Sequence, residues 1–312
     1  EIDEMDLLLA KIMYDIKTKQ NFGKSDGSLV KLIKIKYAKI SKEKNLVNSP
    51  RFRIRLFKMY SRLLLQKRDY QSLENFLIES HNYFLKDKLF DRSNHHEKLT
   101  LLTYLSNCFY KNNKYEKSLK YADELLVSMK EYDSFLYNKY LFYYYNMLIL
   151  NHAKTDKKKA LNYLDQASSN EIIKKLPSYN VFIYLNRSLI YYYEKNYKES
   201  QKNISRLILQ DDFLLLDKSF QLKILITDLM VRILVSNENI LEKIAYINKD
   251  FKSLILLDNH IREKKMIDII FKKINQKDLM EDKNSLLSLM LDAESEDTDI
   301  ISYNTWVKEN IK

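Results

Sequence analysis

The sequence has 312 residues, of which 46% are hydrophobic and 30% are charged, so the chain is long enough to bury a core. It contains only two glycines and two prolines, whereas tight β-turns and the phosphate-binding loops of α/β enzymes depend on glycine. This composition argues against β-rich and α/β classes and predicts an all-α fold. The single cysteine, Cys108, excludes an internal disulfide and is expected in the core, because it lies in an apolar helical stretch.

The formal net charge of +11 is distributed unevenly along the chain. Residues 281–312 contain eight acidic residues and three lysines, a net charge of −5, which leaves about +16 on residues 1–280. The contrast predicts either an anionic partner for the basic body or an acidic tail that docks on that body. A lysine-rich surface that is simply solvated is the default alternative.

From the N-terminus, residues 2–20 and 28–44 predict a helical pair, joined by a loop that holds both glycines. Asn48-Ser49-Pro50 marks the next helix start, with a capping side chain before a proline that needs no backbone donor. Leu176-Pro177-Ser178 opens a later helix in a similar way. Both prolines of the chain therefore mark helix starts.

The chain begins at Glu1 rather than methionine, which leaves room for an upstream signal, anchor or domain and leaves the localisation open, with the cytoplasm favoured. The sequence has no run of 18 apolar residues, so no membrane span is expected in this chain.

Short polar connections divide the middle of the chain into pairs of amphipathic helices. They cover residues 66–69, 111–114, 155–157, 194–196 and 236–239. The segments that follow these connections are alike, and matching Ser118, Ala160 and Ser200 gives steps of 42 and 40 residues. A repeat of this length corresponds to two helices that bury their apolar faces only by stacking on their neighbours.

Two of these units resemble the tetratricopeptide-repeat (TPR) family. In that family a first helix ends in a Leu-x-x-x-Tyr-like pattern, and a tight turn leads to an aromatic residue and then to a small residue three positions on. The matching residues are Leu105, Phe109, Lys111, Asn113, Tyr115, Ser118 and Ala122 in one unit, and Tyr184, Ser188, Tyr191, Tyr197, Ser200 and Ile204 in the other. The departures are a period near 40 rather than about 34, Asn113 or Asn196 at the turn glycine, and no repeat-ending proline.

The resemblance covers roughly residues 50–250 and implies a right-handed α-solenoid of about five to six helical hairpins, with a period of about 40 residues. The expected division of the chain is an N-terminal helical pair or cap (1–47), TPR-like repeats (48–255), C-terminal capping helices (256–291), and an acidic tail with a short amphipathic helix (292–312). In TPR-like stacks the first helix of each hairpin lines the concave face.

The residues do not predict catalysis, and neither a cofactor nor a metal ion is expected. His95 and His96 are adjacent, so they point to different faces of a helix, and we expect surface capping there rather than zinc binding. Gly23-Lys24-Ser25 resembles the end of a phosphate loop but lacks the preceding glycine and strand, and it is interpreted as a hinge. The sequence has no cysteine pair, His-Glu-x-x-His run or nucleophile elbow.

Tyrosine is the conspicuous residue, with 24 in all and triplets at 143–145 and 191–193. Three successive residues span about 200° of a helix, so at least one tyrosine of each triplet is expected to reach the concave face. On an earlier helix, basic residues including Lys58 form a stripe with helical spacing. The predicted contact residues are Arg51, Arg55, Arg62, Tyr140, Tyr144, Tyr184, Tyr191 and Trp306. The alternatives are tyrosines that fill the core and a basic stripe that faces solvent.

The sequence therefore predicts a non-enzymatic scaffold that binds a protein or peptide segment, acidic segments included, on a concave face lined by Tyr and Lys/Arg. One alternative is the sensory or regulatory half of a peptide-responsive transcription regulator, with its DNA-binding domain elsewhere. Another is a nucleic-acid-binding helical repeat protein, which rests on charge alone. The acidic tail that carries Trp306 is also expected to dock on a basic face of its own or of a neighbouring molecule.

Overall fold

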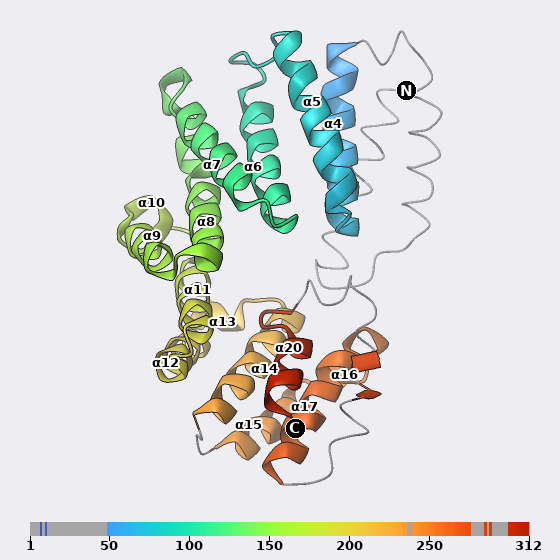
Figure 1. Ribbon diagram of the computed structural model, residues 1–312, viewed down its shortest axis with the longest axis vertical. Helices are drawn as coiled ribbons and strands as arrows, with labels where there is room; N and C mark the ends of the chain where they lie inside the picture. Colours follow the sequence, from blue (N-terminus) through green and yellow to red (C-terminus); the bar gives the residue numbers. More distant parts are fainter. Residues whose placement is uncertain are drawn as a thin grey trace. The chain divides into compact units, whose positions relative to one another are not determined.

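The computed structural model describes residues 49–235, 239–275 and 299–311, together with isolated positions at 7, 10, 284, 285, 287 and 288. Within these residues every regular element is a helix or a helical turn (Figure 1), which confirms the predicted all-α class. The chain divides into two compact units, Glu1–Ile173 and Lys174–Lys312, and each is described by itself. Apart from positions 7 and 10, the helical pair predicted over 1–47 lies outside the described residues, as do its Gly23-Lys24-Ser25 hinge and the acidic residues 292–298.

The first unit contains three helical hairpins in its described part. They are α4 (Pro50–Lys67) with α5 (Tyr70–Lys86), α6 (His95–Lys111) with α7 (Tyr115–Met129), and α8 (Tyr137–Thr155) with α9 (Lys157–Ser169), while the helical turn η1 (Tyr132–Ser134) lies between α7 and α8. Each helix from α4 to α9 packs on the next (Figure 1). Pro50 lies in the first turn of α4, as predicted. Ser49 takes the cap position, although its side chain makes no capping hydrogen bond with the described residues.

The second unit begins with two hairpins, α11 (Tyr179–Tyr193) with α12 (Tyr197–Ile208) and α14 (Lys218–Leu234) with α15 (Ile240–Asp250). Longer helices α17 (Ile261–Ile274) and α20 (Tyr303–Asn310) follow. The sequence did not predict the short elements α13 (Asp211–Leu214), α16 (Lys252–Ile255) and η2 (Asp258–His260) of this unit, nor α10 (Glu171–Lys174), three of whose residues belong to the first unit. Along the chain, α4, α6, α8, α11 and α14 begin 39 to 45 residues apart. These first helices therefore follow the predicted period of about 40.

Paired serines make the close helix contact that the TPR resemblance implies. Ser106 on α6 donates to the backbone carbonyl of Ser118 on α7 over 2.8 Å, and Ser118 donates to the carbonyl of Ser106 over 2.7 Å. In the second unit Ser188 donates to the carbonyl of Ser200 over 2.9 Å. All four serines are buried. Because these side chains are small, the helices of each hairpin approach closely enough to bond side chain to backbone across the contact.

Several helix corners adopt the left-handed backbone conformation without glycine. Arg68, Asn113 and Lys195 have φ angles of 57°, 60° and 61°. Asn113 stands where a turn glycine would, as predicted, but in the later turn Lys195 does so, and the prediction for Asn196 was wrong. Asn196 has a φ of −85° and caps α12 instead, its side chain accepting a hydrogen bond from the Glu199 amide. In both turns the left-handed residue is the one directly before the N-cap of the second helix.

Each unit encloses its own apolar core. In the first unit, Phe57, Leu73, Leu105 and Cys108 belong to one buried cluster. In the second unit the core is centred on α14, whose residues from 221 to 232 are all buried. Among the described residues no helix is both long enough and apolar enough to cross a membrane.

Cys108 is expected to resist thiol reagents as long as the first unit is folded. Its side chain is fully buried and donates to the Tyr70 carbonyl over 3.1 Å. Burial, and then the charge of Glu74, raise the pKa of the Cys108 thiol to about 12, so the reactive thiolate is scarce near neutral pH. Labelling by DTNB, followed by absorbance, should be at least ~100-fold slower for the native chain than for the denatured chain. Equal labelling rates would show that Cys108 is accessible.

Candidate functional site

Three first helices of the first unit, α4, α6 and α8, bring basic and aromatic side chains together. We call this surface the first-helix face and define it by Arg62 on α4, His96, Thr100 and Tyr104 on α6, and Tyr140 and Tyr143 on α8. Residues four apart on α6 project to the same side, which aligns its three members along the helix. Helical spacing thus accounts for the three members on α6, while the packing of α4 and α8 on α6 adds the other three.

At the contact between α4 and α6, the basic stripe of α4 turns toward α6. The guanidinium of Arg62 lies 5.8 Å from the centre of the Tyr104 ring, and Lys58 forms an ion pair with Glu97. The ring of Phe57 also packs beside Tyr104, with ring centres 6.2 Å apart. Arg62 is thus placed by an aromatic contact, of the kind that orients a cation at a binding surface.

At the contact between α6 and α8, the hydroxyl of Tyr140 is held by several groups of α6. It lies 2.6 Å from Thr100 Oγ1 and 2.7 Å from His96 Nδ1, and it lies 3.1 Å from the backbone carbonyl of His96. Tyr140 is only 3% exposed, and burial raises the pKa of its hydroxyl well above the ordinary value. Partial burial, and then the charge of Lys139, lower the pKa of His96, so its imidazole is neutral at pH 7.

Tyr143 presents the aromatic surface of this face to solvent. Its side chain is 43% exposed, and its ring centre lies 5.9 Å from that of the buried Tyr140. Tyr104 beside it is half-buried, and burial raises the pKa of its hydroxyl although Arg62 opposes the shift. The result is an exposed tyrosine that packs on the ring of Tyr140, which its own neighbours hold in place.

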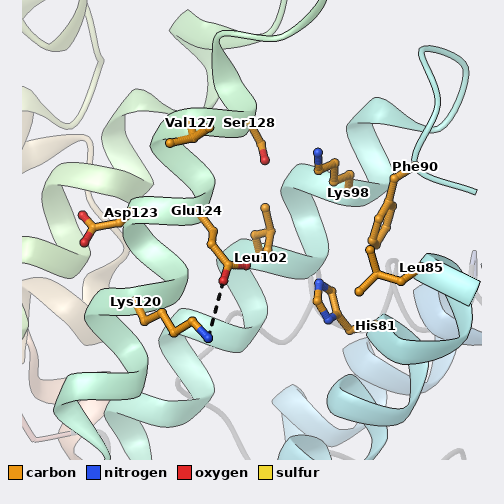
Figure 2. A pocket seen from close by; sticks show the side chains of 10 residues that line it. All are labelled: His81, Leu85, Phe90, Lys98, Leu102, Lys120, Asp123, Glu124, Val127 and Ser128. Carbon is orange, nitrogen blue, oxygen red and sulfur yellow. Dashed lines mark ion pairs between the residues drawn. The ribbon is translucent and has the colours of Figure 1, made fainter. Parts of the chain in front are cut away.

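A pocket of about 630 Å³ opens on the other side of α6, between α5 and α7 (Figure 2). Its wall consists of His81, Leu85, Phe90, Lys98, Leu102, Lys120, Asp123, Glu124, Val127 and Ser128. Leu85 and Val127 at the rim are 54% and 67% exposed. Both lysines have acidic neighbours, since Lys98 lies 2.7 Å from Glu131 and Lys120 lies 4.0 Å from Glu124. The pocket therefore offers an apolar partner side chain a hollow surrounded by balanced charges.

His81 forms part of the pocket wall and is not exposed to bulk solvent on all sides. Its ring lies between Phe90 and Tyr121, with ring centres 5.7 and 5.9 Å away. Burial lowers the pKa of His81, and the charge of Glu124 opposes this only in part. A neutral imidazole at pH 7 contributes contact area to the pocket rather than charge.

The structure corrects the prediction for one of the two adjacent histidines. His95 is not a surface cap, because it is fully buried, with the rings of Tyr132 and Phe135 centred 4.9 and 5.5 Å from its own. His96 lies on the exposed side of α6 and contacts Tyr140, so the two residues do point to different faces. Within the described part of the chain, no cluster of three or more His, Cys, Asp or Glu is placed to hold a metal ion.

Ser219, His260 and Glu263 in the second unit share the residue types of a hydrolytic triad. His260 Nε2 lies 3.1 Å from Ser219 Oγ, but His260 Nδ1 lies 3.6 Å from Glu263, beyond hydrogen-bond distance. His260 is only 4% exposed, and Glu263 is paired with Lys223 over 2.6 Å. This geometry fits a buried polar network that holds α14, η2 and α17 together.

The comparisons with known proteins agree with the helical repeat architecture. Neither a protein-family model nor a curated protein matches the sequence. Among solved structures, the apo form of the quorum sensor NprR from B. thuringiensis is similar, with a TM-score of 0.65 and 12% sequence identity over 97% of this chain and 81% of that one. The chain has a TPR-like helical repeat fold. At this level of identity the similarity concerns the fold alone.

Within this fold, the predicted contact residues lie in different places. Arg62 and Tyr140 belong to the first-helix face, while Arg51 is exposed near the start of α4 and Arg55 is half-buried along it. Tyr144 is half-buried, and burial, followed by the charge of Asp123 on α7, raises its pKa to about 12. It therefore lies toward the second helices rather than on the face.

The remaining predicted contact residues belong to the second unit. Tyr184 and Tyr191 are half-buried on α11, and Tyr184 packs against the core. Trp306 is fully buried, so it anchors its own helix and a partner has no access to it while α20 is in place. Tyr104 and His96 were not among the predicted contact residues, although their spacing of eight residues, two helical steps of four, was a usable signal.

Proposed function

We propose that this protein is a non-enzymatic scaffold that binds a peptide or protein segment on the first-helix face of its first unit. The observation that carries the proposal is Tyr143, which is 43% exposed above the fixed ring of Tyr140. Tyrosine and arginine dominate the energy of protein interfaces, because each provides a large contact area together with hydrogen bonds. Arg62 beside Tyr104 supplies the second of these residue types.

The contacts beneath the face favour binding because they hold its side chains in place before a partner arrives. Tyr140 is held by Thr100 and His96, and Tyr104 is held between Phe57 and Arg62. A partner then loses little additional side-chain entropy on the protein side, which improves affinity. The positive charge of Arg62 favours a partner segment with a carboxylate near its aromatic contact.

The substitution Tyr143→Ala is expected to weaken peptide binding at least ~10-fold, since it removes an exposed aromatic contact typical of an interface hot spot. A phage-displayed library of random peptides, selected on the full chain, would supply a fluorescein-labelled probe for polarisation measurements. The matched control is Tyr246→Ala, because Tyr246 is 42% exposed but lies on α15 of the other unit. Enrichment of no peptide, or equal losses in both variants, would remove the proposal.

A second candidate function is the sensory half of a regulator, and the fold similarity to a quorum sensor favours it. When it binds a peptide, a sensory module changes conformation beyond its contact surface, so its hydrogen exchange changes there too. A passive scaffold is protected from hydrogen exchange only where the peptide lies. Hydrogen exchange of the full chain with and without the selected peptide distinguishes the two. Direct nucleic-acid binding rests on net charge alone, and a titration with a single-stranded oligonucleotide at low salt would reveal it.

A further inference from the structure

In the second unit, α17 holds a segment of the chain itself. Residues 299–311 lie against α17, and their buried side chains belong to the same apolar core as those of α14. The charge of Lys223 on α14 also acts on Asp299. In Figure 1, α20 crosses α14 and α17 within this unit. Residues 299–311 therefore cover this part of the second unit and share its core.

Two cations of α17 hold the two ends of this segment. Arg262 near the start of α17 donates to both carboxylate oxygens of Asp299, over 3.0 and 2.8 Å. Lys273 near the end of α17 donates to the backbone carbonyl of Asn310 over 2.6 Å. Arg262 also lies 5.5 Å from the centre of the Tyr303 ring. A bidentate Arg–carboxylate pair and a cation at a helix C-terminus are contacts typical of peptide recognition.

Between these ends the segment buries apolar side chains as an amphipathic helix does in a groove. Ile301, Tyr303, Trp306, Val307 and Ile311 are at most 2% exposed. They recur at intervals of two, three, one and four residues, which places them along one side of α20 and its flanks. The segment is thus bound as a short helix that inserts its aromatic and aliphatic face, and a carboxylate at its start orients it.

The segment is self-contained, but its contact with the unit is imperfect. Ser302 accepts from the Thr305 amide at the start of α20, and Asn310 donates to the Trp306 carbonyl at its end, so both ends are capped from within. The Tyr303 hydroxyl and the Trp306 indole nitrogen are buried without a hydrogen-bond partner among the described residues. Unpaired buried donors weaken an association, and here they weaken the docking of the segment itself.

We propose that the surface of α14 and α17 is a second recognition site, whose resident ligand is residues 299–311 and whose external ligand is a partner's amphipathic helix with an acidic residue at its start. The partner displaces the resident segment and takes over its contacts with Arg262 and Lys273. This site belongs to the second unit and does not depend on binding at the first-helix face. A helix that merely covers the end of the core would not exchange in this way.

Trp306 makes the exchange measurable in the intact chain, because it is the only tryptophan and is fully buried. The probe is a synthetic peptide of residues 298–312 with Trp306→Phe, which adds no tryptophan signal of its own. Titration of the full chain should give a saturable red shift of Trp306 emission as α20 leaves the core. The tethered segment competes at an effective concentration on the order of 1 mM, so the titration must extend to several times ~1 mM.

Two matched changes sharpen this experiment. A peptide that also carries Asp299→Asn should need at least ~10-fold higher concentration, since it lacks the carboxylate for Arg262. The full chain with Asp299→Asn should be displaced at a concentration at least ~10-fold lower, because its resident segment is weakened while the recognising surface is unchanged. Circular dichroism checks that this variant is folded. If it is not folded, the titrations of the wild-type chain with the two peptides decide the proposal.

Three results would overturn the proposal. They are an unchanged Trp306 emission over the whole titration, equal potency of the two peptides, and binding of a fluorescein-labelled copy of the peptide without any shift of Trp306. The last result would place the peptide elsewhere on the chain.

Discussion

The substitution Glu263→Gln is expected to lower the free energy of unfolding of the second unit by about 3 kcal/mol at neutral pH. Glu263 and Lys223 form an ion pair over 2.6 Å, and each side chain is only 3% exposed. An amide at this position cannot compensate the positive charge of Lys223, which stays buried. Urea denaturation followed by Trp306 fluorescence measures the loss, because Trp306 lies in the same core. Glu309→Gln is the control, since Glu309 is exposed on α20.

The difference between wild type and this variant should shrink in acid. Burial alone would raise the pKa of Glu263, but interactions with His260 and Lys223 outweigh it and lower the pKa to about 2, from an ordinary 4.5. Between these values the folded state binds fewer protons than the unfolded state, so the stabilisation is complete above about pH 4.5 and is lost as the pH falls toward 2. Glutamine does not titrate. A difference that stays constant from pH 7 to pH 3 would show that the pKa of Glu263 is not lowered.

Asp299 does not disturb this comparison. Burial raises its pKa above the ordinary 3.8 although the charge of Arg262 opposes the shift. Its contribution therefore has the opposite sign, and stability falls as the pH rises from 3.8 through the raised pKa. Because Asp299 is present in both proteins, this contribution cancels in their difference.

The substitution Ser118→Leu should destabilise the first unit by about 3 kcal/mol, whereas Ser118→Ala should cost about 1 kcal/mol. Ser118 donates to the Ser106 carbonyl and accepts from Asn151 over 2.9 Å, so alanine loses both hydrogen bonds. Leucine loses them too and forces α6 and α7 apart, because the side chain of Ser118 is fully buried between them. Leucine is therefore expected to destabilise the unit more than alanine, because it adds overpacking to the loss of the hydrogen bonds.

DTNB labelling of Cys108 in increasing urea measures this effect, since Cys108 reports opening of the first unit. Ser169→Leu is the control, because Ser169 is exposed at the end of α9. Trp306 emission should show unchanged unfolding of the second unit in all three variants. Equal midpoints for Ser118→Leu and Ser118→Ala would show that α6 and α7 are not tightly apposed at this position.

The helices and their pairing could be predicted because they depend on local chemistry. Pro50 fits only the first turn of a helix, and Ser118 and Ser200 recur where two helices must approach closely. The side to which a tyrosine turns depends on the neighbouring hairpin, which spacing within one helix does not contain. Tyr140 and Tyr143 are neighbours on α8, yet one is 3% and the other 43% exposed.

The buried polar contacts could not be predicted for a related reason. Lys223 and Glu263 are 40 residues apart, and a lysine in an otherwise apolar helix is normally expected at the surface. In the sequence, Asp299 is one of several acidic residues near the end of the chain. In the fold, its contact with Arg262 distinguishes it from the others. Net charge alone was enough to predict that the tail docks on a basic face. The two residues in contact, Arg262 and Asp299, could be identified only from the fold.

The left-handed corners explain how such a protein can be built almost without glycine. A residue with a β-carbon is strained there by about 1 kcal/mol, but it also loses less backbone freedom on folding than glycine, by about 0.4–1 kcal/mol. The two effects nearly cancel at Arg68, Asn113 and Lys195. A genome whose base composition makes glycine codons rare can therefore still encode helical hairpin arrays. Folds that need glycine where the backbone approaches a ligand closely are harder for such a genome to encode.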